Sequence, residues 1–128
     1  MICDMPFLVG AGKLSDSEIS PGSIALSAFW GGSLTKYSCT DSPNEILSCL
    51  PKVDSLFQLN GDAGMFYSKD GCWIECLGVW RIPVILMVLP SPDGEIPGLA
   101  AAYVSLCDRF SVPLIGLVQL GGKWNSTF

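Results

Sequence analysis

The sequence predicts one α/β domain over residues 1–128, with three layers, a mostly parallel sheet and βαβ units. Two uncharged apolar runs, Pro83–Leu89 and Val112–Leu120, carry this prediction. Continuous β-branched and aliphatic residues without alternation are typical of strands that are covered on both faces. Between these runs, Gly98–Phe110 has an apolar stripe at helical spacing. Strand, helix and strand in this order predict a right-handed βαβ unit.

A second helix and strand are predicted before this unit. Ser42–Glu45 has the form of a capping box with proline at the first helical position, and the helix is expected to end before Pro51. Val53–Leu59 has the apolar residues of a strand. Cys72–Trp80 fits a short helix, or a hairpin strand after Asp70-Gly71. We favour the helix, because the segment that follows has the character of a parallel-sheet strand.

The N-terminal forty residues give weaker signals than residues 42–120, which are the best-defined part of the domain. Phe7–Val9 and Ile24–Trp30 are apolar and strand-like. Ser15–Glu18 and Ser20–Ser23 are rich in turn-forming residues, so we expect loops or turns there.

Composition excludes several classes of function. Hydrophobic residues make up 49% and charged residues 15% of the chain, a balance that rules out a disordered protein. Seven basic and twelve acidic residues give a net charge of −5, which argues against binding a nucleic-acid backbone. The chain has no histidine, so a histidine-based triad, a histidine general base and a histidine-ligated metal are excluded.

The six cysteines are interpreted as structural thiols, since several lie inside apolar runs where cysteine behaves as a small hydrophobe. Cys72 and Cys76 would share a helix face, but a zinc site needs about four ligands and no second pair has matching spacing. No signal peptide is recognisable at the N-terminus. The longest apolar run, Ile82–Pro90, is too short for a membrane span of about twenty residues. We therefore expect a cytoplasmic protein that has no membrane partner.

Ligands of open parallel sheets bind beyond the carboxyl ends of the strands. Three loops leave such ends here, Asn60–Gly64, Pro90–Glu95 and Gly121–Asn125, and they would converge if their strands were neighbours. The candidate ligand-binding residues are Asn60, Gly61, Asp62, Gly64, Ser91, Asp93, Gly121, Gly122 and Lys123. No catalytic residue, cofactor or metal is predicted, except that Asp62 would hold Mg²⁺ if that ion binds. The alternative interpretation of Asn60–Gly64 is a tight turn with Asp62 as a local cap.

Gly10–Lys13 has the composition of a phosphate-binding loop but not its pattern. Phe7 stands where the first glycine is required, and Leu14 stands where a serine or threonine would bind magnesium. Phosphate binding through this loop is therefore not expected.

Residues 53–120 resemble the C-terminal half of the dethiobiotin synthetase family of P-loop-related enzymes. That family has a strand ending in Glu-Gly-x-Gly-Gly, a short helix, a Leu-Pro-Val-Ile-Leu-Val-Val strand, a helix and a Pro-Leu-x-Gly-Val strand. The corresponding segments here are Leu56–Gly64, Cys72–Trp80, Ile82–Val88 and Val112–Val118. The family's magnesium-binding glutamate falls on Asn60, and the phosphate loop is missing. The resemblance therefore implies an architecture, and it argues against carrying over ATP-dependent ligase activity.

Two functions from different classes follow. The first is a non-catalytic cytoplasmic domain that acts by binding a partner protein or its own copy, and it rests on the missing catalytic set and the apolar, aromatic-rich composition. The alternative is a small nucleotide- or phosphate-ligand-binding enzyme, or a degenerate synthetase-like protein, that uses Asn60–Gly64. A redox or metal role for Cys72 and Cys76 is a third hypothesis.

Overall fold

The computed structural model describes residues 5–30, 32–51, 55–66, 71–90 and 98–121. The described residues form a five-stranded sheet in the order β2-β3-β1-β4-β5, and every neighbouring pair is parallel. The strands are β1 (Phe7–Gly10), β2 (Ser33–Ser38), β3 (Ser55–Asn60), β4 (Val84–Val88) and β5 (Leu114–Gln119). The helices are α1 (Asp16–Trp30), α2 (Pro43–Ser48), α3 (Trp73–Val79) and α4 (Gly98–Arg109). The predicted α/β class is confirmed.

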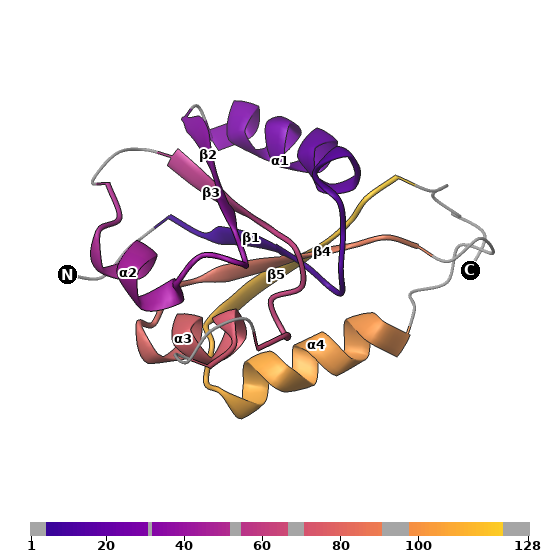
Figure 1. The fold of residues 1–128 in the computed structure, drawn as a ribbon. Coiled ribbons are helices and arrows are strands. Elements are labelled where there is room, and N and C mark those ends of the chain that lie inside the picture. Colours follow the sequence, from indigo (N-terminus) through magenta and orange to yellow (C-terminus); the bar gives the residue numbers. More distant parts are fainter. Residues whose placement is uncertain (1–4, 31, 52–54, 67–70, 91–97, 122–128) are drawn as a thin grey trace.

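The sheet separates the helices unequally. Helix α1 lies alone on one face, whereas α2, α3 and α4 lie on the other (Figure 1). Right-handed crossovers explain this division, because the chain moves in one direction from β1 to β2 and in the opposite direction through every later connection. The larger core cluster lies on the side of α2, α3 and α4, and the smaller one lies beneath α1.

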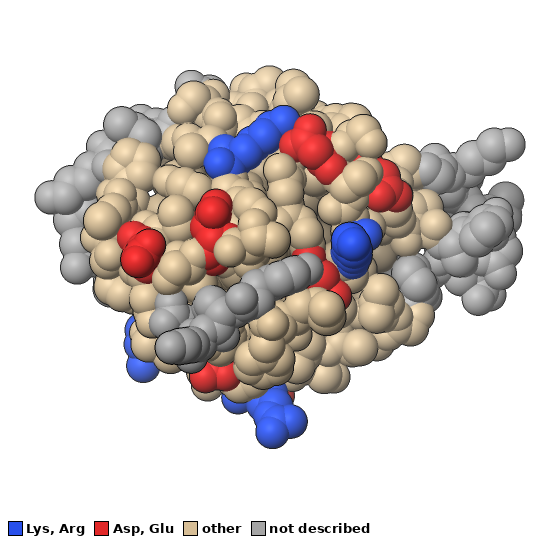
Figure 2. Space-filling view, in the orientation of Figure 1, with Lys and Arg blue, Asp and Glu red and all other residues tan. Residues whose placement is uncertain are grey.

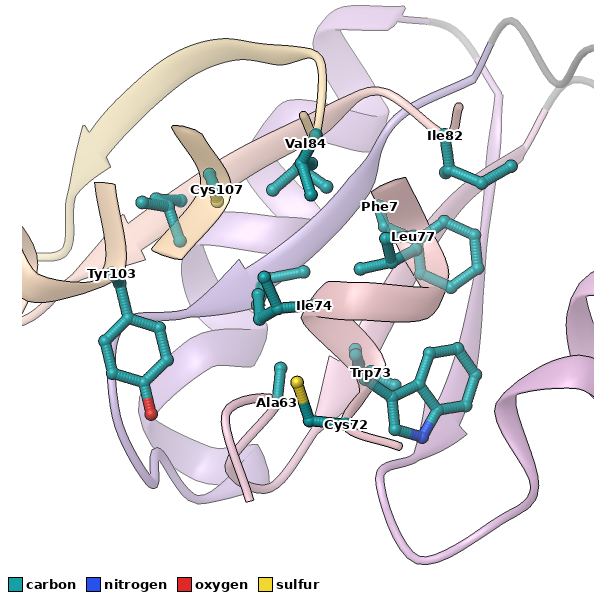
Figure 3. Close-up of a cluster of buried hydrophobic side chains, with 14 of the residues drawn as sticks. Phe7, Ala63, Cys72, Trp73, Ile74, Leu77, Ile82, Val84, Tyr103 and Cys107 are labelled. Atoms are coloured by element: carbon teal, nitrogen blue, oxygen red, sulfur yellow. The ribbon is translucent and has the colours of Figure 1, made fainter. Parts of the chain in front are cut away.

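Helix α3 settles the ambiguity over Cys72–Trp80 in favour of the helix. The backbone N–H of Glu75 donates to the sulfur of Cys72, which caps the first turn at 3.5 Å. Trp73, Ile74 and Leu77 are each at most 1% exposed and turn toward the sheet, where Phe7 of β1 lies (Figure 3). Burial of three large apolar side chains on one helix face is what holds this short helix in place.

Residues 16–30 form helix α1, so the prediction of a strand at Ile24–Trp30 with loops before it was wrong. A reciprocal capping box starts the helix: Ser15 Oγ accepts from the Glu18 N–H at 3.3 Å, and Glu18 Oε1 accepts from the Ser15 N–H at 2.9 Å. The Ser-x-x-Glu signal of this box was present in the sequence. Pro21 and the neighbouring glycine and serines concealed it, because together they resemble a turn.

The helix continues through Pro21-Gly22 because of its packing. A Cβ on Gly22 would lie 2.4 Å from Cδ2 of Leu120 and 2.9 Å from Cε of Met87, so a larger residue here would require these two side chains to shift. The hydroxyl of Ser23 donates to the carbonyl of Ile19 at 3.1 Å, which satisfies a buried polar group within the helix. Tertiary contact thus outweighs the turn propensity of the sequence.

Two further expectations are corrected at the edges of the sheet. Strand β2 was missed, because its residues Ser33–Ser38 are polar and only partly buried. Strand β5 was expected to be covered on both faces, but its burial alternates and Ile115 and Leu117 are 57% and 42% exposed. An edge strand has a neighbour on one side only, so an apolar run there need not be buried.

The predicted capping box of α2 is also only partly correct. The helix does begin with Pro43, but the side chain of Ser42 makes no capping hydrogen bond to it.

Candidate functional site

The carboxyl ends of β1, β2 and β3 enclose a polar crevice of about 360 Å³. The chain leaves β1 toward α1 on one face and leaves β3 toward α3 on the other, so the boundary between these two strands is the topological switch point of the sheet. Lys13 and Ser38 line the crevice together with Asn60 and Gly61. The first turn of α1 supplies its acidic wall.

A polar network joins α1 to the sheet beside this crevice. Asp16 Oδ1 accepts from Gln58 Nε2 at 2.9 Å and from Asn60 Nδ2 at 3.2 Å, and it lies 3.0 Å from Lys36 Nζ. Gln58 is fully buried on β3, and its Oε1 accepts from the Ser20 hydroxyl at 3.3 Å. The hydrogen bond from Lys36 lowers the pKa of Asp16 below its ordinary value. These contacts fix the start of α1 above β3 and β2.

The acidic first turn of α1 changes what the crevice can hold. Hydrogen bonds from the Ser15 backbone and hydroxyl lower the pKa of Glu18, so this carboxyl is ionised together with Asp16. Two carboxylates at a helix N-terminus occupy the position where a bound phosphate would otherwise lie. The crevice therefore suits a neutral or mixed-charge polar ligand better than a polyphosphate.

Asp62 and Gly64, which follow β3, turn away from the crevice toward α4. Asp62 Oδ1 accepts hydrogen bonds from the Tyr103 hydroxyl and, at 3.0 Å, from the Gly64 N–H. Burial and the bond to Asp62 raise the pKa of Tyr103 above its ordinary value. Asp62 thus makes the bond of a local cap and ties the loop to helix α4.

The structure brings together only some of the predicted ligand residues. Asn60 and Gly61 line the crevice, whereas Gly121 follows β5, which is separated from β3 by β1 and β4. Ser91, Asp93, Gly122 and Lys123 lie outside the described residues. Residues of the crevice that sequence reasoning did not select are Lys13, Leu14, Ser15, Asp16, Glu18 and Ser38. Only the strand order, which brings β1 beside β3, shows that these residues belong with Asn60.

The described cysteines are thiols, and most are buried. Cys39, Cys72, Cys76 and Cys107 are buried, and Cys49 is exposed. Burial, with the neighbouring Asp62 charge, raises the pKa of Cys39 to about 12, and burial raises that of Cys107 to about 11. Such thiols are protonated at neutral pH and are poor nucleophiles. No group of three or more potential metal ligands occurs among the residues that the structure describes.

Helix α1 is only weakly amphipathic, since it buries Ile19, at 1% exposure, beside three serines. Its sheet-facing side buries Ser20, Ser23 and Ser27, while Ile24 and Phe29 are 58% and 86% exposed. The ring of Phe29 meets that of Trp30 edge to face, with centroids 6.2 Å apart. A surface helix normally turns its apolar residues toward the core. The outward side of α1 is therefore an apolar surface of the kind that marks an interaction site.

An apolar groove of about 650 Å³ runs beside this helix. One wall is α1, with Pro21, Ala25 and Phe29, and the other is formed by Leu89 after β4 and by the end of β5 with Leu120. The groove lies beside α1, which packs mainly over β2 and β3, where the helix meets Leu89, Val118 and Leu120 at the ends of β4 and β5. A parallel sheet normally has both faces covered.

The face seen in Figure 2 has no cluster of basic side chains among the described residues, because Lys and Arg are interspersed with Asp and Glu.

Among the described helices, none has the length and apolar character needed to span a bilayer. No model of a known protein family matches the chain, and no curated protein sequence matches it either.

Proposed function

We propose that this domain acts by binding, and that its partner is a second copy of the same chain, held through the outward side of α1 and the adjoining groove. The observation that carries the proposal is the apolar outward side of α1, where Ile24 and Phe29 are 58% and 86% exposed. Desolvation of such a surface is favourable at roughly 25 cal/mol for each Å² of apolar area. A bound copy would cover the outward side of α1 and the groove beside it.

The composition of α1 supports the same proposal. From Ser20 to Trp30 the helix carries no charged residue. A helix side that stays in water ordinarily carries charged residues, whereas the centre of a protein interface is depleted of them and enriched in aromatic side chains. Phe29 and Trp30 provide such aromatic groups at the end of the helix.

Sedimentation velocity over a hundredfold range of protein concentration tests the proposal. We expect a single reversible shift from monomer to dimer as the concentration rises. A protein that stays monomeric to millimolar concentration would refute self-association. A second measurement, hydrogen exchange of α1 at both ends of the range, should show slower exchange in the dimer.

We propose a polar small-molecule site at the switch-point crevice as a second candidate function. The supporting observation is that Lys13, Ser38, Asn60 and Gly61 come together beyond the carboxyl ends of three neighbouring strands. This is the position at which open parallel sheets bind ligands. A nucleotide or phosphate ligand with Mg²⁺ is the form of this candidate that the resemblance in residues 53–120 suggests, and the carboxylates of Asp16 and Glu18 oppose it.

Thermal denaturation with a panel of nucleotides and uncharged nucleosides, each with and without Mg²⁺, separates these ligand classes. A ligand at one hundred times its Kd should stabilise the fold by about 2.7 kcal/mol. Stabilisation that disappears in Asn60→Leu but persists in the distant Val79→Ser variant would support the crevice. Absence of any shift across the panel would count against both forms of the candidate.

A further inference from the structure

We infer that the switch-point crevice binds a free amino acid, with the carboxylate of the ligand at Lys13 and Asn60 and its ammonium group at Glu18. This inference rests on the second proposed function and names the ligand class of that site. All three residues line the crevice, and each retains a polar group that no described residue engages. Two of these groups are hydrogen-bond donors and the third is a charged acceptor, and this combination carries the inference.

Lys13 supplies a positive charge that has no partner in the described part of the chain. Its side chain is exposed in the loop between β1 and α1, and its ammonium group makes no hydrogen bond or ion pair with a described residue. Lys36, by contrast, lies 3.0 Å from Asp16 and is neutralised there. The Lys13 ammonium group therefore remains available to a carboxylate, whose oxygens accept charge-assisted hydrogen bonds.

The amide of Asn60 is oriented so that one of its N–H groups remains for a ligand. Asp16 is ionised and can only accept hydrogen bonds, so the amide nitrogens of Asn60 and Gln58 must both face it. The Oδ1 atom of Asn60 in turn accepts from Gln58 Nε2 at 2.6 Å. A primary amide has two N–H groups, and Asp16 uses one of those on Asn60. The second is a donor in the same crevice as Lys13, which favours an oxygen acceptor such as a carboxylate.

Glu18 supplies the acceptor for an ammonium group. Its Oε1 accepts from the N–H and from the hydroxyl of Ser15, both at 2.9 Å, which holds the carboxylate in the first turn of α1. Its Oε2 accepts no hydrogen bond from a described residue. The bonds from Ser15 also lower the pKa of Glu18, so the carboxylate is charged at neutral pH. A ligand with an ammonium group and a carboxylate satisfies both Glu18 and Lys13.

The charge balance of the crevice opposes ligands of a single charge. Once Asp16 is paired with Lys36, the charges left are those of Lys13 and Glu18, which cancel. A polyphosphate would face the two carboxylates, and a metal cation would face Lys13. The described residues also contain no group of three or more potential metal ligands. The volume of about 360 Å³ lies near the lower end of the roughly 300–1,000 Å³ that is usual for ligand cavities, which suits a small zwitterion.

Titration of the full chain, followed by proton–nitrogen correlation NMR at constant ionic strength, tests the inference. Glycine, β-alanine and γ-aminobutyrate are zwitterions whose two charges lie progressively further apart. Propionate and propylamine carry one charge each, and adenosine carries none. We expect saturable shifts at Lys13–Glu18, Ser38 and Asn60–Gly61 with at least one zwitterion, at a Kd at least threefold below that of either singly charged probe.

Three variants show whether the two charges act as inferred. Lys13→Met removes the cation, and Glu18→Gln removes the negative charge but keeps the capping box, since glutamine also serves at that position. Each should raise the Kd of the zwitterion about three- to fivefold, the strength of an exposed ion pair. Glu18→Gln should also lower the Kd of propionate, and Lys13→Met that of propylamine, because a like charge is removed. Arg109→Met is the matched control, an exposed cation in the last turn of α4, and should leave every Kd unchanged.

The possible results separate this inference from the proposed function beneath it. Zwitterions that bind no better than propionate and propylamine, or a Kd unchanged in both crevice variants, would overturn the inference. Shifts of the crevice resonances by adenosine alone would keep the crevice as a ligand site and show that the amino-acid class is wrong. If no probe moved these resonances, the crevice itself would be refuted as a small-molecule site.

Discussion

Replacing Gly78 by alanine tests the packing of α3 against the end of α4. A methyl group built on Gly78 would lie 2.0 Å from the carbonyl oxygen of Phe110 and 3.1 Å from its carbonyl carbon. Both atoms belong to the backbone, so the clash cannot be relieved by a side-chain rotation. The two segments must move apart, or the end of α4 must shift.

Whether Gly78→Ala lowers or raises the free energy of unfolding shows which effect is larger, the steric clash or the higher helix propensity of alanine. In an exposed helix interior, alanine is favoured over glycine by about 1 kcal/mol. Overpacking a tight contact costs about 1–3 kcal/mol, and a fixed backbone atom at 2.0 Å places Gly78→Ala at the upper end of that range. We therefore expect a net loss of about 2 kcal/mol in the free energy of unfolding, which lowers Tm by roughly 8 °C for a domain of this size.

Urea denaturation followed by tryptophan fluorescence and circular dichroism measures this loss. Gly98→Ala is the matched control, since Gly98 also lies in a helix but has no atom within 4 Å of the added methyl group. That variant should be unchanged or stabilised by about 0.5 kcal/mol. If Gly78→Ala were as stable as Gly98→Ala, the close approach of α3 to Phe110 would be wrong.

Three further predictions concern other parts of the molecule. Asp16→Asn should destabilise the fold at about pH 6, and the difference from the wild type in free energy of unfolding should shrink as the pH falls through the lowered pKa of Asp16. The reason is that a carboxyl with a depressed pKa in the folded state stabilises the fold only while it is ionised. Urea midpoints measured at about pH 6 and at a pH below that pKa provide the check, and a constant difference would contradict the role of the Lys36 bond. Tyr103→Phe removes the hydrogen bond to Asp62 and should cost about 1–2 kcal/mol. Because the pKa of Tyr103 is raised, alkaline titration of tyrosine absorbance should also lose a late-ionising component in this variant, and an unchanged titration curve would argue against the burial of that hydroxyl. Leu117→Lys should slow aggregation on heating with little change in Tm, since lysine blocks the pairing of edge strands, and light scattering that matched the wild type would exclude β5 as the aggregating segment.

Composition and periodicity predicted much of the fold. The continuous apolar run around β4 and the apolar stripe of α4 correspond to the observed strand and helix, because burial on both faces of a sheet and on one face of a helix leaves a local pattern. Helix α3 was also predicted, from Trp73, Leu77 and Trp80 at helical spacing. The inward sides agree only in part: α4 buries Ala100, Tyr103 and Cys107 and leaves Leu99 51% exposed, and Trp80 at the end of α3 is 38% exposed.

The sequence patterns failed to predict β2 and α1, because the polar or apolar character of these two elements depends on their position in the folded molecule. Strand β2 is polar because it forms an edge of the sheet. Helix α1 buries serines, and the hydroxyl of one of them, Ser23, donates a hydrogen bond to the Ile19 carbonyl in the same helix. The helix also carries Pro21-Gly22 at the point where it packs against Leu120. Such segments have the composition of loops, and only contacts distant in sequence give them their structure.

The candidate sites divide in the same way. The sequence by itself determined that Asn60 and Gly61 end a strand of a parallel sheet, since a glycine-bearing turn follows an apolar run there. Only the tertiary structure placed Lys13 and Ser38 beside them, because the order of the strands is fixed by crossovers that no local pattern encodes. The exposure of Phe29 is likewise a tertiary property: the same apolar residues would be core if α1 were rotated about its axis, and the packing of Gly22 and the bonds of Asp16 set that rotation.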